Sequence, residues 1–295
     1  HARQLSESET GAPKIGRQPE MLAEVGCDGI KMIETKPTNR QKMDMPLTDS
    51  YYADYWARAE ELGTTILCHV NDPEEFWDPD AIPEWASQRN WGYGPEDVQK
   101  EQLYSEVDTV LKRHPNLNII FAHFYFLSAD LERAGQFLED HPTVYLDLAP
   151  GVEMLYNISE DPEAGREFFI QYADRIMFGT DIGSTLTIPE ARARAGIVYR
   201  WLESDDTFRV PSEADFLLGP PEDGVIRGMS LPEDVLRKVY RENFVGLTGP
   251  LPRPLDLEKA IAYCEQLASA AEALSGTPAE DTQAADAAEC LTGMQ

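Results

Sequence analysis

Five short runs of apolar residues punctuate the chain, and each has the length of a β-strand. They cover residues 29–34, 65–70, 118–123, 144–149 and 175–181. Within each run the apolar residues are nearly continuous rather than alternating with polar ones. Continuous apolar strands are typical of a parallel sheet that is covered on both faces. The pattern therefore predicts five buried, parallel strands.

The segments between these runs place apolar residues at helical spacing. Pro189 can open one of these helices, and Ser230 is the expected N-cap of another, with Pro232 in its first turn. Strands that alternate with helices favour an α/β fold, either a (β/α) barrel or a doubly wound sheet. The predicted helices cover residues 18–26, 50–62, 101–114, 129–140, 163–174, 189–203 and 230–243.

Three regions depart from this rhythm. Residues 71–100 hold three tryptophans and four prolines with little periodicity, and a loop that long is usually functional, often a lid. Residues 205–229 form a second irregular insertion. We expect an α/β unit over residues 1–250, a C-terminal helix over 251–274, and a disordered tail over 275–295, because that tail is rich in Ala, Asp, Glu and Thr.

The composition narrows the range of partners. The net charge is −28, from 25 Lys and Arg against 53 Asp and Glu, and such a surface repels nucleic acid and anionic membranes. No apolar run approaches the ~18 residues of a membrane span. The four cysteines form neither a zinc-finger spacing nor a disulfide framework, which fits a reducing cytoplasm. We therefore expect a cytoplasmic protein whose partner is a small-molecule substrate.

Three of the predicted strands end in a residue that can bind a metal ion: His69, His123 and Asp181. In parallel α/β folds the active site lies at the carboxyl ends of the strands. Imidazole nitrogens and a carboxylate suit a catalytic divalent ion, zinc first among them, with one open coordination position. Such an ion lowers the pKa of bound water to about 7, and Asp181 can also accept the proton of that water. Any one of these residues alone is more often structural, but three on one sheet favour a site.

The same strand ends resemble those of the amidohydrolase-related proteins. The resemblance rests on Leu67-Cys68-His69, Ile120-Phe121-Ala122-His123 and Met177-Phe178-Gly179-Thr180-Asp181. It extends to Gly29-Ile30-Lys31 and to the helix from Leu231 to Phe244, and it covers roughly residues 18–248. It implies a (β/α)8 barrel of the TIM type, in a family of hydrolases and decarboxylases. It also suggests a homo-oligomer.

The resemblance assigns a role to each strand end. His69 would close strand five as a metal ligand, and His123 would close strand six as a second ligand or a catalytic acid–base. Asp181 would close strand eight as ligand and base. The family's first strand carries a His-x-His pair that this sequence does not contain. The five runs match strands four to eight, so we expect a chain that lacks the first three strands.

Four further residues are candidates for substrate binding: Lys31, Asn71, Trp77 and Trp91. The leading interpretation is metal-dependent hydrolysis of a C–N, C–O or lactone bond in a small organic substrate. Nonoxidative decarboxylation of an aromatic or unsaturated acid is the first alternative, because it uses the same ligands. A non-catalytic relative that binds a ligand is the second, because the His-x-His pair is missing.

Overall fold

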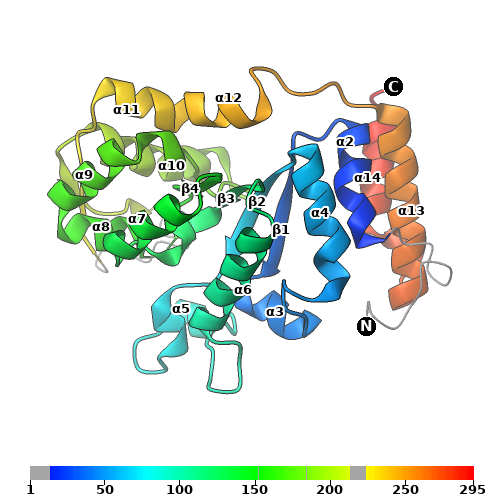
Figure 1. Cartoon of the computed structure of the whole chain (residues 1–295), viewed down its shortest axis with the longest axis horizontal. Coiled ribbons are helices and arrows are strands. Elements are labelled where there is room, and N and C mark those ends of the chain that lie inside the picture. Colours follow the sequence, from blue (N-terminus) through cyan, green and yellow to red (C-terminus); the bar gives the residue numbers. More distant parts are fainter. Residues whose placement is uncertain (1–13, 152, 184, 213–223) are drawn as a thin grey trace.

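The computed structural model describes residues 14–151, 153–183, 185–212 and 224–295. Five parallel strands form its main sheet, in the order in which they follow one another along the chain (Figure 1). Each occupies one of the apolar runs, so the predicted strands are confirmed. They are β1 (Gly29–Thr35), β2 (Thr65–Val70), β3 (Asn118–Phe121), β4 (Val144–Asp147) and β5 (Ile176–Met177).

A helix follows each strand, which gives the chain its β/α rhythm. A parallel neighbour needs such a crossover, because the chain must return to the other end of the sheet. The strand order shows no reversal, which a doubly wound sheet would require. The fold is therefore α/β with the sequential strand order of a (β/α) barrel. The connecting helices are α3 (Pro37–Met43), α4 (Ala53–Leu62), α6 (Lys100–Arg113), α7 (Leu131–Asp140), α8 (Met154–Glu160), α9 (Pro162–Gln171) and α10 (Ile188–Glu203).

The two faces of the sheet differ in burial. Ile66, Cys68 and Phe121 point into the main core, where they join Trp56 of α4 and Leu103 of α6. On the other face the register pairs Lys31 with Leu67. Here β1 is open to solvent, with Lys31 exposed and Ile33 45% exposed. The expectation that every strand is covered on both faces is therefore wrong for β1.

The helix after the 205–229 segment begins later and ends later than predicted. Its first residue is Glu233, after Pro232, whereas Ser230 lies at φ 46° and its amide donates to the Ser204 carbonyl. Ser230 is therefore not the N-cap, because its backbone is committed to that contact. The helix runs as α11 (Glu233–Arg237), the π-helical segment η7 (Lys238–Glu242) and α12 (Asn243–Thr248).

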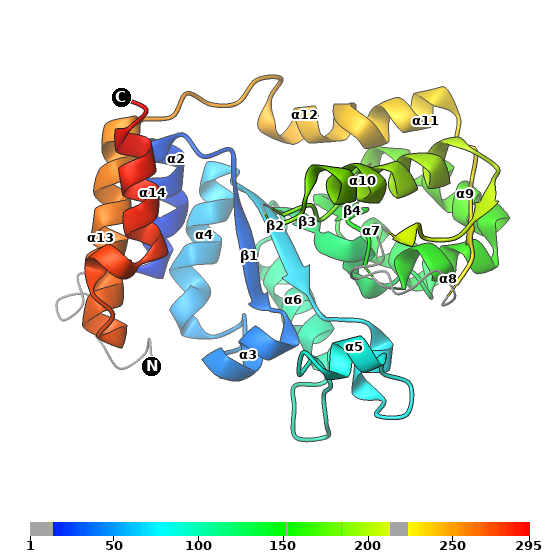
Figure 2. The ribbon, with the colours of Figure 1, turned by 180° about the vertical axis from the view of Figure 1, so that it is seen from behind.

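The C-terminal residues form two helices rather than a disordered tail. Helix α13 (Leu257–Ser275) packs against α14 (Gln283–Thr292) and against α2 (Gln18–Val25), as Figure 2 shows. Buried Ala268 and Ala288 are small enough for close packing. Thr282 caps α14 by accepting from the amide of Ala285. The prediction of disorder over 275–295 was wrong, because an alanine-rich segment also suits a helix that packs on another helix.

Short elements complete the described chain. The 71–100 segment contains η3 (Glu74–Trp77) and α5 (Glu84–Ser87), with a small core of Phe76, Ala86 and Tyr93. The 205–229 segment contributes the antiparallel pair β6 (Thr207–Phe208) and β7 (Ile226–Arg227). Within the described ranges, every helix is too short or too polar to cross a bilayer. The remaining turns are η1 (Ile15–Arg17), η2 (Ser50–Tyr52), η4 (Ala122–Phe126), η5 (Ala173–Arg175) and η8 (Ala279–Asp281).

Candidate active site

His69 is the penultimate residue of β2, and contacts of its Nε2 atom fix its ring. That atom lies 3.0 Å from the carbonyl oxygen of Asn71 and 3.4 Å from Oδ1 of Asp72. Burial lowers the pKa of His69, and the neighbouring Asp72 carboxylate partly offsets this effect. The imidazole is therefore neutral at pH 7, with its proton on Nε2 directed at the two oxygens and Nδ1 left as a lone-pair nitrogen.

Asp72 is the buried anchor of His69. Its carboxylate accepts from Lys36 Nζ at 2.6 Å and from the Tyr93 hydroxyl at 2.6 Å. Burial alone would raise the pKa of Asp72, but the contacts with His69 and Lys36 outweigh it and hold the pKa below its usual range. Asp72 is therefore ionised. It joins the start of the 71–100 segment to Lys36, just after β1, and to Tyr93 later in the same segment.

His123 follows β3 in a turn with unusual backbone geometry. The strand ends at Phe121, earlier than predicted, and His123 has φ 57° and ψ 41°. Its amide donates to Oδ1 of Asp147 at 2.9 Å, and its Nδ1 lies 3.1 Å from the carbonyl oxygen of Ala149. Burial and the nearby His69 lower the pKa of His123 to about 4. His123 is therefore neutral, with its proton on Nδ1 and a free lone pair on Nε2.

Asp181 lies in the loop after β5, at φ 50°. Gly179 lets this loop approach β4, because a Cβ there would lie 2.7 Å from the amide nitrogen of Ala149. Buried Arg194 of α10 donates from Nε to the Thr180 carbonyl at 2.6 Å and lies 3.7 Å from Oδ2 of Asp181. The Asp181 side chain is 46% exposed, so it is the most open of the three candidate ligands.

His69, His123 and Asp181 all line one pocket of about 90 Å³, which we call the histidine pocket. The rings of His69 and His123 meet edge to face, with centroids 4.8 Å apart. The pocket is small, and three aromatic side chains, Phe76, Trp91 and Phe126, form part of its wall. Its other lining residues are Lys36, Asp72, Pro73, Phe76, Trp91, Phe126, Pro150 and Gly151.

The donor chemistry of this pocket fits a divalent ion in part. Both imidazoles are neutral, and each commits one nitrogen to a protein oxygen, which is how metal-binding histidines are usually oriented. In the described part of the chain, however, no three His, Cys, Asp or Glu side chains converge closely enough to hold an ion. The described residues therefore supply a partial ligand set rather than a complete metal centre.

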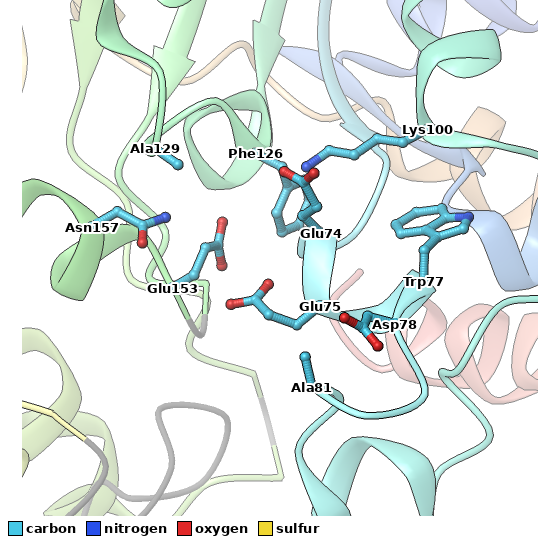
Figure 3. A pocket seen from close by; sticks show the side chains of 10 residues that line it. All are labelled: Glu74, Glu75, Trp77, Asp78, Ala81, Lys100, Phe126, Ala129, Glu153 and Asn157. Atoms are coloured by element: carbon cyan, nitrogen blue, oxygen red, sulfur yellow. The ribbon is translucent and has the colours of Figure 1, made fainter.

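A second, larger cleft lies beside this pocket (Figure 3). Its volume is about 470 Å³, and Phe126 lines both cavities. Gly151 lies between them, because a Cβ there would lie 3.0 Å from Oε2 of Glu153 and 3.6 Å from Cβ of His123. Other residues of the cleft wall are Glu74, Glu75, Trp77, Asp78, Lys100 and Asn157.

The four predicted substrate-binding residues fall in different places. Trp91 lines the histidine pocket, where Lys36 Nζ lies 4.6 Å from its ring centre, and Trp77 lines the larger cleft. Lys31 is exposed on β1 and lines neither cavity. Asn71 is fully buried and donates to the Lys100 carbonyl at 3.3 Å, which joins the loop to α6.

Sequence reasoning missed several residues of these cavities. Phe126 and Phe76 lie within segments whose aromatic content alone does not single out one ring. Glu153 and Lys100 are titratable, and Glu153 follows β4 closely enough to have been a candidate for the carboxyl edge of the sheet. Arg194 lies in mid-helix, so nothing in the local sequence connects it to the Asp181 loop.

The positions of these residues in the fold indicate the class of protein, and a comparison with known families identifies the family. In (β/α) barrels the active-site residues lie at the carboxyl ends of the parallel strands, and His69, His123 and Asp181 lie at or just beyond those ends here. The chain matches the amidohydrolase family over residues 20–243, and it therefore belongs to that family, which confirms the resemblance. No curated protein matches the chain.

Two solved structures are similar to it. An uncharacterised TIM-barrel protein from Bordetella bronchiseptica is 16% identical, with a TM-score of 0.44, and the match covers 81% of this chain. The 4-oxalomesaconate hydratase of Rhodopseudomonas palustris is 13% identical, with a TM-score of 0.43, and the match covers 83% of this chain. The chain spans 65% and 61% of the lengths of these two proteins.

Proposed function

We propose that the chain hydrolyses a C–N, C–O or lactone bond of a small organic substrate at the pocket of His69, His123 and Asp181. The observation that carries this proposal is the pair of neutral imidazoles, 4.8 Å apart between ring centres, with a carboxylate in the same pocket. Membership of the amidohydrolase family supports it.

His69 and His123 would hold a divalent ion, zinc first, through the nitrogens that their protein contacts leave free. Such an ion makes water a stronger nucleophile at neutral pH. Asp72 and the Ala149 carbonyl keep the two imidazoles in the tautomers that this role needs. The described residues provide no third converging ligand, so water, substrate or a group outside the described residues would complete the coordination.

Asp181 would act as the general base. It is partly open to solvent, and Arg194, 3.7 Å from its Oδ2, limits the directions in which the carboxylate can turn. In a hydrolysis, Asp181 would accept the proton of the attacking water and return it to the leaving nitrogen or oxygen. Phe76, Trp91 and Phe126 would keep other water molecules away from the reacting bond.

The first test is metal content. The purified protein, incubated with zinc and passed through a desalting column, is expected to retain zinc in near-stoichiometric amount. His69→Ala and His123→Ala are each expected to lower zinc affinity by about 10–100-fold or more, since each removes a ligand. His114→Gln is the matched control, because His114 contacts Glu60 at the surface end of α6 and lies outside both cavities. Equal zinc retention by all four proteins would contradict the proposal.

The second test is turnover on panels of esters, lactones and amides, with aromatic and unsaturated acids as a separate panel. Hydrolysis that Asp181→Asn abolishes would support the proposal. Carbon dioxide release from the acids without hydrolysis would replace it with nonoxidative decarboxylation. The incomplete ligand set favours one other candidate, a relative that binds a ligand without turnover. Zinc-free protein without turnover on either panel would select that candidate.

A further inference from the structure

Acidic side chains outnumber basic ones in the lining of the larger cleft. Glu74, Glu75, Asp78 and Glu153 line it, and Lys100 is the one basic side chain of its lining. In Figure 3 the carboxylates of Glu153 and Glu75 point toward each other across the cleft, and Lys100 reaches toward Glu74. Two carboxyl groups that face one another repel when both are ionised, so a positively charged occupant would stabilise the ionised form of both.

Glu153 is the buried member of this group. The residue is 7% exposed, and neither oxygen of its carboxyl group bonds to another residue in the described part of the chain. Burying an unpaired carboxylate is strongly unfavourable, and buried polar groups without partners are rare. Burial raises the pKa of Glu153 to about 8, so in the free protein the group stays largely protonated at neutral pH. A cationic ligand would supply the missing partner.

The remaining walls suit an organic cation better than a metal ion. Trp77 and Phe126 present aromatic surface to the cleft, and Trp77 is held by its Nε1 bond to the Val98 carbonyl at 3.2 Å. Aromatic rings and carboxylates together bind ammonium and amidinium groups. Among the described residues, no three acidic or imidazole side chains converge as a metal site would require. The volume of about 470 Å³ also has room for several carbon atoms around the charge.

The cleft adjoins the histidine pocket at Phe126 and Gly151. Phe126 lines both cavities, and a Cβ added at Gly151 would contact both Glu153 and His123, so these two side chains flank the same backbone position. We infer that the cleft binds the ammonium or amidinium end of a small organic substrate, with Glu153 as its counterion and the reacting bond at His69 and His123. This inference rests on the proposed function, because it names the substrate class of that site.

The test is a binding experiment with three isosteric probes of different charge. Benzamidinium, benzamide and benzoate have nearly the same shape, so calorimetric titration of the wild-type protein isolates the effect of charge. Benzamidinium is expected to bind at least about tenfold more tightly than benzamide, since a buried charge-assisted hydrogen bond contributes that much. Benzoate is expected to bind most weakly, because it meets the acidic wall.

The variants assign the charge preference to this cleft. Glu153→Gln keeps the shape of the side chain and is expected to remove most of the preference for benzamidinium. Glu75→Gln alters a half-buried residue and leaves the core intact, and it is also expected to lower the affinity for benzamidinium. Glu96→Gln is the control, because Glu96 is exposed on the same loop and lies outside the lining of both cavities.

Two outcomes would overturn the inference: equal affinity for benzamidinium and benzamide, or a preference that survives both Glu153→Gln and Glu75→Gln. The readout is independent of turnover. If zinc binding and hydrolysis fail while Glu153-dependent benzamidinium binding persists, the proposed function is wrong and the cation site remains. If hydrolysis occurs without any preference for positively charged substrates, the inference alone is wrong.

Discussion

The turn that carries His123 holds four consecutive residues in the left-handed region. His123, Phe124, Tyr125 and Phe126 have φ between 52° and 58°. Each such residue is disfavoured by about 1–2 kcal/mol, so the turn stores several kcal/mol of backbone strain. Phe124 and Tyr125 are at most 2% exposed, and their burial offsets this strain. The result is that His123 and Phe126 face the same small pocket.

Glu153 makes a prediction about stability that does not depend on any ligand. Its pKa is about 8 in the folded chain, against 4.5 for the ordinary group. A raised carboxyl pKa means that the folded state binds the proton more tightly than the unfolded state does. Proton binding by Glu153 therefore adds to the free energy of unfolding below about pH 4.5, and this contribution is lost as the pH rises through about 8. Glu153→Gln cannot ionise and so does not lose this contribution. Its free energy of unfolding is expected to exceed that of the wild type by a few kcal/mol near pH 8, with little difference near pH 4.5.

The measurement is urea unfolding of both proteins over this pH range. Charged neighbours face Glu153 from η3 and α6, so the control must keep Glu75 and Lys100. Glu96→Gln serves, since Glu96 is exposed, and its stability is expected to follow the wild type at every pH. A difference between Glu153→Gln and wild type that stays constant from pH 4.5 to 8 would contradict the prediction.

At the residue scale, sequence reasoning found the histidines and Asp181 but not the groups that hold them. His69, His123 and Asp181 stand out because each follows an apolar run. The Ala149 carbonyl and Arg194 act through contacts between segments that are distant along the chain. Such contacts depend on register and on loop paths, and local residue pattern carries no information about either.

At the scale of elements, the apolar runs were sufficient to locate all five strands, because burial in a parallel sheet imposes a continuous apolar pattern. Three expectations failed for identifiable reasons. β1 has an open face, since Lys31 and Ile33 have no covering layer among the described residues. Ser230 bonds through its backbone to Ser204 instead of capping a helix. The alanine-rich tail gains its order from packing against α13, which composition does not reveal.

One side chain of α12 binds two carbonyl groups at the start of β5. Asn243, at the start of α12, donates from Nδ2 to the carbonyl oxygens of Ala173 and Ile176, both at 2.7 Å. Asn243→Ala leaves both carbonyls without this donor, and the expected loss is about 1–3 kcal/mol of unfolding free energy. Because β5 leads into the Asp181 loop, the variant is also expected to show faster amide hydrogen exchange at Phe178, whose amide donates to Val239.

The matched control for this prediction is Asn116→Ala. Asn116 is exposed, and the substitution keeps the bond from its backbone amide to Glu60 while removing only a surface contact of its side chain with the same carboxylate. Its unfolding free energy is expected to stay within about 0.5 kcal/mol of the wild type. The prediction is contradicted if the unfolding free energy of Asn243→Ala also stays within about 0.5 kcal/mol of the wild type. Water would then replace the amide donor without loss of stability.

At the scale of the whole molecule, charge is the dominant feature. The chain carries 53 acidic residues against 25 basic ones, so most acidic groups have no basic partner available. The surface ion pairs, such as Lys112 with Asp108 and Arg133 with Glu101, each contribute little, with a median of about 0–1 kcal/mol. The long-range repulsion among the excess carboxylates acts on the folded state more strongly than on the expanded one, because folding brings the charges closer together.

Salt is therefore expected to stabilise this protein rather than weaken it. Screening shortens the Debye length from about 30 Å at 0.01 M to about 8 Å at 0.15 M, which removes repulsion across the molecule while sparing contacts at hydrogen-bond distance. The melting temperature by scanning calorimetry is expected to rise by several degrees over that range of sodium chloride. An equal ionic strength of potassium chloride should give the same rise, because screening does not distinguish the two cations. A melting temperature that falls with salt would contradict this prediction. It would mean that attraction within the surface ion pairs outweighs repulsion among the excess carboxylates, because the acidic groups are spaced so that they rarely face one another.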